Sequence, residues 1–564
     1  MRHRPLAVLL LGALIAGLAA VPSAIGRDAP SPTDVLSMIS VDAPTRAARQ
    51  RLVELGLDSA DHSDPTHVAL VVTAADMQRL RAAGFTYRVD VPDLARREVQ
   101  RIALDAAYAA AADTKAMPSG RKAYRSLADY DHDLHQLAVE NPGLVKLIAL
   151  PAKTLEGRIV HGIEITDQVQ AKDAKPVFVL LGVHHAREWP SGEHAIELAY
   201  DLVNTWRAGD VRTHDLLGRA RVIVVPVVNP DGYDVSFESA KIADGRELQN
   251  PDSRGDGADY VAIQQGPQGA YKRKNCRMIE GQDTPSGSCM APGSRYLGVD
   301  DNRNYGALWG GAGASSFPGD DIYRGAAPFS EPETQNIRTL ISHRQVTMMV
   351  TQHTFAGLVL HAPGVKDQGV TADEPALADV GARMAAANGS ISEAGYQLYD
   401  TTGTTEDWSY SATGGFGYTF ELPVREFHPP YAETVDEYYG TGKTAGRGNR
   451  EALYIALTTA ADRRYHSVIA ADAPKGAVLR LQKSFETTTS PVRSNETQFT
   501  SDDTAGPPLR VRDSLDTTTL STGHVEWHVN PSTRPAVMER KVYDVAATPA
   551  RTFTTSGTAP AAGQ

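Results

Sequence analysis

Four uninterrupted apolar runs, each rich in β-branched residues, most constrain how this chain can fold. They are KPVFVLLGV (175–183), RVIVVPVV (221–228), VTMMVTQ (346–352) and GYTFEL (417–422). Continuous apolar runs, unlike alternating ones, are typical of strands buried on both faces of a sheet. Helical patterns lie between them, notably SGEHAIELAYDLVNTWR (191–207). The sequence therefore predicts an α/β fold with a mixed, mostly parallel sheet flanked by helices.

Two segments of different character flank this α/β region, which we expect to span residues 123–465. Residues 27–122 contain a helix-like stretch (46–58) and a strand–helix–strand pattern (66–91), followed by an Ala- and Arg-rich connector. They predict a small α+β unit. Residues 466–564 are rich in Thr, Ser and Val, with short strand-like pieces and turn signals. They predict a C-terminal β-sandwich-like domain with a disordered tail.

The composition limits the classes of function. The chain has 564 residues, and its formal net charge is −12. An acidic balance argues against a nucleic-acid-binding protein, which usually carries a basic surplus. Hydrophobic residues make up 41% and charged residues 22%, which is typical of a globular protein with large cores. After the N-terminus, no stretch is long and apolar enough to predict a membrane span.

The first residues have the layout of a secretory signal peptide. Arg2, His3 and Arg4 precede an apolar run at 6–20, and small residues follow it. A membrane anchor is the alternative, but the run is shorter than the roughly 20 residues that a spanning helix needs. We therefore expect residues 1–26 to be cleaved and the protein to be secreted to the extracellular space.

The two cysteines are interpreted in the light of that export. Cys276 and Cys289 lie in a stretch that contains Gly, Ser and Pro. An oxidising compartment permits a disulfide bond that closes this loop, with two free thiols as the alternative. Two cysteines are too few for a Cys-based zinc cluster.

Residues with catalytic chemistry stand at the ends of the apolar runs. GVHHAREWPSGEH follows the first run, and a neutral imidazole at His185 and a carboxylate at Glu188 can converge on one zinc ion. An H-x-x-E pair alone is a weak signal and needs a distant third ligand. His353 directly follows the third run, and Glu421 lies near the end of the fourth. Because ligands gather beyond the carboxyl ends of parallel strands, we expect these residues to share one site.

These motifs, in this order, resemble those of the zinc metallocarboxypeptidases of the A/B/T type (funnelins), including secreted bacterial forms. The resemblance covers about residues 123–460 and places the small N-terminal unit where that family has its propeptide. It implies a zymogen with one Zn²⁺ per catalytic domain, which an activating protease would process. It also implies hydrolysis of the last peptide bond of peptides and proteins. The motifs that carry it are HHAREW, YKRKN, GVDDNRNY, TQHTFAG, QLYDTTGTTEDWSY and YTFEL.

The resemblance implies the roles of the metal-binding residues. His185, Glu188 and His353 would hold zinc and leave its fourth position open for water. Glu421 would act as the general base. Asp300 would accept a hydrogen bond from His185 and orient it.

The resemblance also implies the residues that bind the substrate. Arg273 would stabilise the oxyanion of the tetrahedral intermediate. Asn302 and Arg303 would bind the terminal carboxylate, since a planar guanidinium matches a carboxylate with two hydrogen bonds. Tyr399 matches the mobile tyrosine that closes over that end, and Arg187 resembles an auxiliary carboxylate site.

Glu406 falls where the family has the floor of its specificity pocket. A carboxylate there favours a C-terminal Lys or Arg, with dual specificity and a preference for apolar ends as alternatives. Phe355 stands where the pancreatic enzymes have a tyrosine, a departure that touches neither metal nor base.

Several alternatives stay open at this point. His184 could replace His185 as a ligand, although the resemblance favours His185. The protein could be a catalytically silent peptide-binding module or a cell-wall peptide amidase on the same scaffold. The acidic stretch 252–260 could bind calcium, but its spacing fits a solvated loop better. Three basic residues are candidate processing sites, namely Lys115, Arg121 and Lys122.

Overall fold

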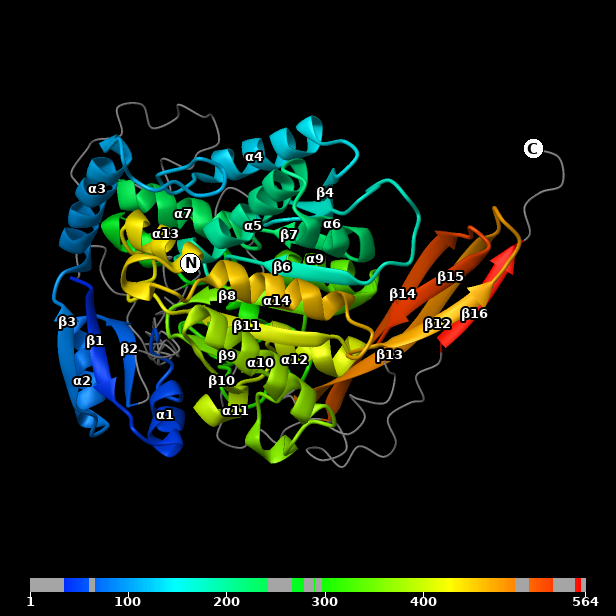
Figure 1. Ribbon diagram of the computed structural model, residues 1–564. Helices are drawn as coiled ribbons and strands as arrows, with labels where there is room; N and C mark the ends of the chain where they lie inside the picture. The colour runs from blue at the N-terminus through cyan, green and yellow to red at the C-terminus, as the bar shows by residue number, and fades with distance from the viewer. Residues whose placement is uncertain are drawn as a thin grey trace, which may run out of the picture.

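In the computed structural model the chain forms three consecutive parts (Figure 1). An N-terminal α+β unit, a large α/β part and a C-terminal β part follow one another. The structure describes residues 35–59, 66–241, 266–277, 289, 297–491 and 507–530, together with the backbone of 553–558. The predicted signal peptide, the acidic stretch 252–260 and residues 559–564 of the predicted C-terminal tail lie outside the described residues.

An eight-stranded mixed sheet forms the centre of the α/β part, with the strand order β10-β9-β11-β8-β6-β7-β5-β4. Its middle strands are parallel to one another and entirely buried. The predicted mixed, mostly parallel sheet is therefore confirmed. The middle strands are β11 (Phe416–Leu422), β8 (Val346–Thr354), β6 (Val177–Leu181) and β7 (Arg221–Val225). The outer strands are β4 (Val145–Lys153), β5 (Ile159–Ile165), β9 (Leu358–His361) and β10 (Ile391–Ala394).

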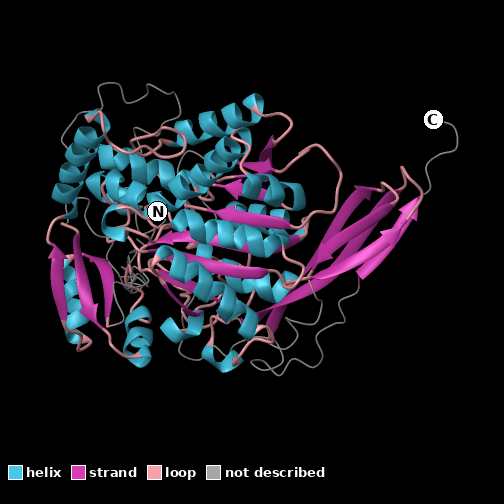
Figure 2. Ribbon diagram, viewed as in Figure 1, coloured by secondary structure: helices cyan, strands magenta, loops and turns pink. Residues whose placement is uncertain are grey.

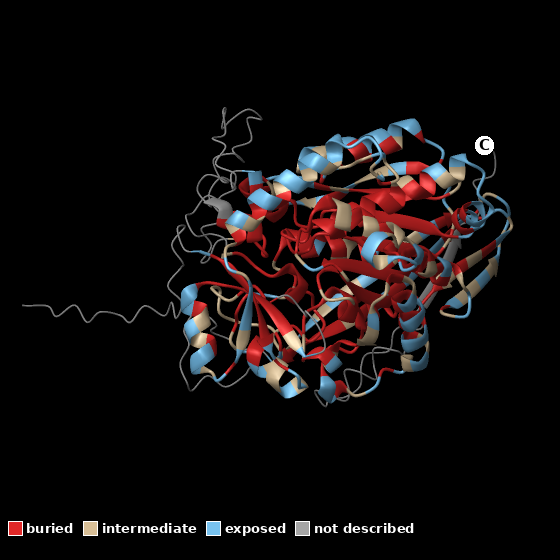
Figure 3. Cartoon of the chain, turned by 60° about the vertical axis from the view of Figure 1, so that its left-hand side comes forward, coloured by how far each residue is buried: buried red, intermediate tan, exposed pale blue. Residues whose placement is uncertain are grey.

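The two faces of this sheet pack into different hydrophobic cores. Phe178 and Leu180 of β6 lie in one core, and Val179 and Leu181 lie in the other. Both faces are therefore apolar, which explains why the four runs are continuous rather than alternating. Figure 2 shows the helices packed around the sheet. Figure 3 shows the buried residues concentrated in the interior of the α/β part.

Different elements cover the two cores. The first core is covered by α4 (Leu127–Glu140), α5 (Trp189–Arg207), α6 (Val211–Arg219), α7 (Pro230–Lys241), α10 (Glu374–Asn388), α13 (Tyr431–Tyr439) and α14 (Asn449–Ala461). The second is covered by α9 (Pro332–Ser342), by α12 (Thr405–Trp408) and by Phe485 of the C-terminal part. None of the described helices has both the length and the apolar composition that a membrane crossing requires.

The N-terminal unit has a core of its own. Its antiparallel sheet has the order β2-β1-β3, and the helix α3 then leads to the central part. The predicted strand–helix–strand pattern is confirmed, whereas the middle strand β1 was not predicted. The elements are β1 (Ser37–Asp42), α1 (Arg46–Val53), β2 (His67–Val72), α2 (Ala74–Ala82), β3 (Tyr87–Val91) and α3 (Leu94–Ala110).

The C-terminal part consists of two small sheets that share a core. Leu481 of one sheet and Trp527 of the other are both buried in it, which is the arrangement of a sandwich. The strands are β12 (Ser467–Asp472), β13 (Val478–Pro491), β14 (Pro508–Leu520), β15 (His524–Val529) and β16 (Phe553–Thr558).

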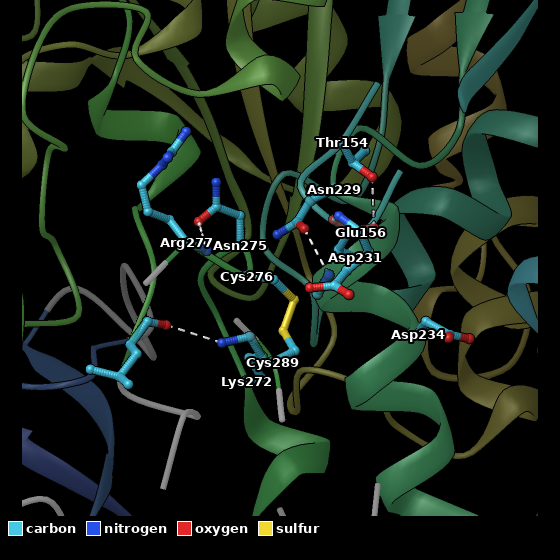
Figure 4. The surroundings of a disulfide bond; sticks show 12 residues. Thr154, Glu156, Asn229, Asp231, Asp234, Lys272, Asn275, Cys276, Arg277 and Cys289 are labelled. Carbon is cyan, nitrogen blue, oxygen red and sulfur yellow. Dashed lines mark hydrogen bonds between the residues drawn. A yellow bond between two sulfur atoms is a disulfide. The ribbon is translucent and has the colours of Figure 1, made fainter. Parts of the chain in front are cut away.

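The predicted disulfide bond between Cys276 and Cys289 is present (Figure 4). Both cysteines are buried against Val235 of α7. The bond therefore joins Cys289 to the segment around Asn275, close to the residues that follow β7.

Candidate active site

Three buried side chains converge near the carboxyl ends of β6 and β8. His185 follows β6, Glu188 immediately precedes α5, and His353 lies near the end of β8. Nδ1 of His185 lies 2.9 Å from Oε1 of Glu188, and Nδ1 of His353 lies 3.0 Å from Oε2. Among the described residues, no other group of three His, Cys, Asp or Glu brings its donor atoms within 4.8 Å of one another.

This donor set fits a zinc ion. Nε2 of His185 lies 3.1 Å from Oδ1 of Asp300. Because an ionised carboxylate only accepts hydrogen bonds, Nε2 carries the proton and Nδ1 has a lone pair. Nδ1 of His185 faces the Glu188 carboxylate and lies 3.1 Å from Nδ1 of His353. A cation bound by these three groups would stabilise their close approach. Two imidazoles and one carboxylate leave the fourth position of a tetrahedral zinc for water.

Asp300 links His185 to Arg273. Nε and Nη2 of Arg273 donate to Oδ2 of Asp300 at 3.1 and 2.9 Å. Burial alone would raise the pKa of Asp300, but Arg273 and His185 hold that pKa well below its usual range. The carboxylate therefore stays ionised and makes the contact with His185 that the sequence predicted.

Glu421 lies on the strand next to His353. The strands β11 and β8 are parallel, and Glu421 stands opposite His353 in their register. Side chains at paired positions of neighbouring strands lie on the same face of a sheet. Glu421 is buried as well, so its side chain lies on the same face of the sheet as His353 and is shielded from bulk solvent.

His184 has other partners. Its Nδ1 lies 2.9 Å from the hydroxyl oxygen of Thr351, and its Nε2 lies 2.9 Å from that of Tyr305. Burial lowers the pKa of His184 well below its usual value, and the neighbouring His353 and His185 rings add to this effect. The geometry therefore favours His185 over His184 as the metal-binding residue.

Asn302 and Arg303 are held in place by neighbouring loops. Oδ1 of Asn302 accepts hydrogen bonds from the backbone nitrogen and the hydroxyl of Thr405, both at 2.9 Å. Nε of Arg303 donates to the carbonyl oxygen of Gly313 at 2.9 Å. The Thr405 hydroxyl oxygen also lies 3.3 Å from Nε2 of His184. These contacts join the predicted carboxylate-binding residues to the loop that carries His184 and the first predicted ligand.

Glu406 and Asp407 lie side by side in α12 but have different partners. Oε2 of Glu406 accepts a hydrogen bond from the Thr419 hydroxyl at 2.9 Å. Among the described residues, no Lys or Arg forms an ion pair with Glu406. Both oxygens of Asp407 accept from the backbone nitrogen of Gly364, and burial and then Glu406 raise the pKa of Asp407 well above its usual value. Asp407 thus holds the loop at Gly364 in place. The buried Glu406 carboxylate is the candidate charge of the predicted specificity pocket.

Tyr399 and Arg187 both lie under the N-terminal unit. Tyr399 and Val53 of α1 belong to the same buried hydrophobic cluster. Nη1 of Arg187 lies 2.6 Å from the carboxylate of Asp58, and its guanidinium lies 3.7 Å from the centre of the Phe427 ring. All of these side chains are buried. The unit therefore contacts Arg187 directly and contacts the segment that carries Tyr399.

Asp58 was not among the residues that the sequence predicted. It lies in the polar stretch GLDSADHSDP, 129 positions before its partner Arg187. No spacing rule connects residues so far apart. The sequence offers only one indirect signal, which is that Asp58 is an acidic residue in the unit placed like a propeptide.

A family model described as zinc carboxypeptidase matches residues 130–441 of this chain. The chain belongs to the zinc carboxypeptidase family. Carboxypeptidase B of Helicoverpa zea is 25% identical over 430 residues, which cover 70% of this chain and 88% of the relative. The zinc carboxypeptidase of Saccharothrix mutabilis subsp. capreolus is 23% identical over 447 residues, or 76% and 91% of the two chains.

Two solved structures show the same fold. The carboxypeptidase A of Helicoverpa armigera has a TM-score of 0.58 at 23% identity and covers 76% of this chain and 98% of its own. Thrombin activatable fibrinolysis inhibitor has a TM-score of 0.54 at 18% identity and covers 76% and 99%. With the family match and the converging His185, Glu188 and His353, the protein is a zinc metallocarboxypeptidase and thus a hydrolase.

Proposed function

We propose that this zinc carboxypeptidase is a secreted exopeptidase that releases single residues from the C-termini of peptides and proteins. The observation that carries the proposal is the convergence of His185, Glu188 and His353, with Glu421 in register beside them. Asn302 and Arg303 are joined by hydrogen bonds to the same region. An assay on peptides that differ only in a free or amidated C-terminus tests it.

The chemistry divides between the metal and the protein. When bound by His185, Glu188 and His353, zinc activates a water molecule and polarises the scissile carbonyl. Glu421 takes the proton from that water and then gives it to the leaving amine. Arg273 stabilises the developing negative charge, with Asp300 fixing the plane of its guanidinium.

The restriction to chain ends follows from the carboxylate clamp, by which we mean Asn302 and Arg303. A guanidinium and an amide that bind a terminal carboxylate fix only the last residue of a chain. The bond presented to Glu421 is then the last peptide bond, and the bound geometry provides the proximity that accelerates the reaction. Tyr399 closes over that end once the N-terminal unit is gone.

We assign the preference for the C-terminal residue to Glu406. Its buried carboxylate keeps one hydrogen bond, from Thr419, and has no ion pair with a described Lys or Arg. A buried carboxylate without a cationic partner favours a side chain that brings one. The pocket is therefore proposed to accept C-terminal Lys and Arg.

The chain is proposed to be made as a zymogen, inhibited by its N-terminal unit. Arg46 of α1 donates to the carbonyl oxygen of Tyr396 at 2.8 Å and pairs with Asp400. Arg49 donates to the carbonyl oxygen of Leu398 at 2.8 Å. These contacts hold the segment that carries Tyr399, while Asp58 takes the place of a substrate carboxylate on Arg187.

The helix α3 provides a second buried attachment. Oε2 of Glu98 lies 3.1 Å from Nε2 of His428, and Glu98 also pairs with Arg101. The Arg101 guanidinium lies 4.9 Å from the centre of the Trp189 ring. After a cut, the contacts of Glu98 with His428 and of Arg101 with Trp189 must therefore break before the unit can leave.

We place the activating cut at the bond between Lys115 and Ala116. Residues 111–116 are mostly exposed and contain neither helix nor strand, as a protease requires. From Met117 onward the chain is attached to the central part. Ser119 contacts the Glu197 carboxylate at 2.8 and 2.6 Å, and the buried Arg125 pairs with Glu197 at 2.7 Å. A cut after Arg121 or Lys122 would detach Ser119 from Glu197, whereas a cut after Lys115 keeps this contact.

Secretion is supported by the signal-like N-terminus and by the disulfide bond between Cys276 and Cys289. Disulfide bonds persist in oxidising compartments outside the cytosol. A pulse-chase experiment with intact-mass measurement of the exported protein would test both secretion and the removal of residues 1–26.

A further inference from the structure

The end of β13 lies against the loop Gly306–Gly313 of the central part. The backbone nitrogen of Leu308 donates to the carbonyl oxygen of Thr488 at 3.1 Å, and the backbone nitrogen of Ser490 donates to that of Trp309 at 3.0 Å. The Ser490 hydroxyl donates to the carbonyl oxygen of Leu308 at 2.6 Å. The C-terminal β part therefore adds a short strand-like pairing to this loop.

Leu308 is the residue that needs this support. Its φ is +54°, in the left-handed region that disfavours residues other than Gly, Asn and Asp. A residue persists there only when its surroundings over-determine its conformation. The contacts from Thr488 and Ser490 engage both backbone polar groups of Leu308, and Gly311 adds a hydrogen bond to the same carbonyl at 3.1 Å.

The loop Gly306–Gly313 also packs closely against β13. A Cβ atom built on Gly311 would lie 2.4 Å from the Ser490 hydroxyl oxygen and 2.9 Å from a methyl carbon of Thr402. Phe485 of β13 is buried in the same core as Tyr305 and Trp408. The loop is thus confined between β13 and the segment that leads to the predicted specificity pocket.

The loop also holds the carboxylate clamp. The carbonyl oxygen of Gly313 accepts from Nε of Arg303 at 2.9 Å, and that of Ala312 accepts from the Thr402 hydroxyl at 2.9 Å. The backbone nitrogen of Gly403 donates to the carbonyl oxygen of Ala307 at 3.0 Å. A shift of the loop would therefore move both Arg303 and the start of the pocket segment.

We propose that Ser490 and the end of β13 are positioning elements for substrate binding. They keep Leu308 in its left-handed conformation and so fix the loop whose Gly313 carbonyl orients Arg303. This inference rests on the proposed function, because it assumes that Arg303 binds the terminal carboxylate. In this proposal the C-terminal β part contributes to substrate binding as well as to the stability of the fold.

Kinetics of the processed enzyme with the variant S490A test this role. The matched control is S514A, the same change at an exposed serine on the neighbouring strand β14. Each protein is assayed on a peptide with a free C-terminal carboxylate and on its amide, and thermal unfolding confirms that each is folded. Loss of about one hydrogen bond predicts that S490A raises the KM for the free acid about three- to tenfold, with kcat within about twofold. The preference for acid over amide falls by the same factor.

The outcomes separate the two proposals. A raised KM and a reduced preference for the acid in S490A, with neither in S514A, support the positioning role. A lower melting temperature of S490A with an unchanged KM shows that β13 only stabilises the fold and overturns the inference alone. If the wild-type enzyme does not prefer the acid, the proposed function fails, and the inference fails with it.

Discussion

The carboxylate of Asp58 and the guanidinium of Arg187 lie 2.6 Å apart, and both side chains are buried. One belongs to the N-terminal unit and the other to the loop that carries two of the predicted zinc ligands. Nε and Nη2 of Arg187 have no hydrogen-bond partner among the described residues, so Asp58 is its principal counterion. In the proposed zymogen, this pair places a carboxylate of the N-terminal unit on an arginine that we propose to bind a substrate carboxylate.

The substitution D58N should activate the uncut chain in part. Removing one partner of a buried ion pair costs about 3–5 kcal/mol, because the remaining charge is left without compensation. We expect the activity of uncut D58N on a short peptide to rise about tenfold or more above that of the uncut wild type. Steady-state assays on chains shown by mass measurement to be uncut provide the comparison.

The control for this experiment is E54Q, which changes an exposed residue at the end of α1. It should leave the uncut chain as inactive as the wild type. Equal activities for D58N and the wild type would show that Asp58 is dispensable for inhibition.

The position of the activating cut gives a second prediction. A trypsin-like protease should cut the wild type after Lys115 and leave Ala116 as the new N-terminus. The variant K115Q should resist activation, whereas R121Q and K122Q should be activated like the wild type. N-terminal sequencing of the products decides the matter, and a first residue beyond Met117 would contradict the proposal.

Much of the fold was predictable because its strands are buried on both faces. The runs that form β6, β7, β8 and β11 consist mostly of apolar residues. They can therefore be predicted as buried strands without knowledge of the strands beside them. The strand β1 was missed because SMISVD mixes apolar residues with Ser and Asp. Its place between β2 and β3 provides the hydrogen bonds that make it a strand, and such long-range pairing leaves no local signal.

The pocket assignment predicts the effect of E406Q, which removes the charge and keeps the size of the side chain. A charged hydrogen bond in a buried site contributes about 1.5–3 kcal/mol. We expect kcat/KM to fall about 10- to 100-fold for peptides that end in Lys or Arg. Peptides that end in Leu or Phe are the internal control and should change little. A wild-type preference for Leu or Phe would refute the role of Glu406.

Acid should weaken the attachment of α3. Burial alone would raise the pKa of Glu98, but Arg101 and His428 lower it to about 2, from an ordinary value of 4.5. A depressed pKa means that the folded chain stabilises the ionised form. That stabilisation, about 3 kcal/mol, is complete above about pH 4.5 and is lost as the pH falls towards 2.

The variant E98Q measures this contribution. The difference in unfolding free energy between the wild type and E98Q should be largest above about pH 5 and shrink by about 3 kcal/mol towards pH 2. The control E140Q alters an exposed glutamate of α4 and should show a much smaller change. A pH-independent difference for E98Q would mean that its ionisation does not hold α3 in place.

The candidate site was predictable where its residues belong to sequence motifs. His185, Glu188 and His353 converge because strands β6 and β8 end side by side, as the α/β pattern required. The contacts that depend on distant segments were not predictable. Asp58 reaches the site through the N-terminal unit, and Ser490 reaches the clamp loop through β13. In both cases tertiary packing brings together residues that are far apart in the sequence.

Zinc-dependent release of C-terminal residues is tested most directly with the processed enzyme and its variant E421Q. Matched peptides ending in Lys, Arg, Leu or Phe, each as free acid and as amide, are incubated with and without a zinc chelator. We expect stepwise release of single C-terminal residues from the free acids only, abolished by the chelator and by E421Q. The variant should still bind one zinc ion. Internal cleavage, equal hydrolysis of the amides, or full activity of E421Q would contradict the proposed function.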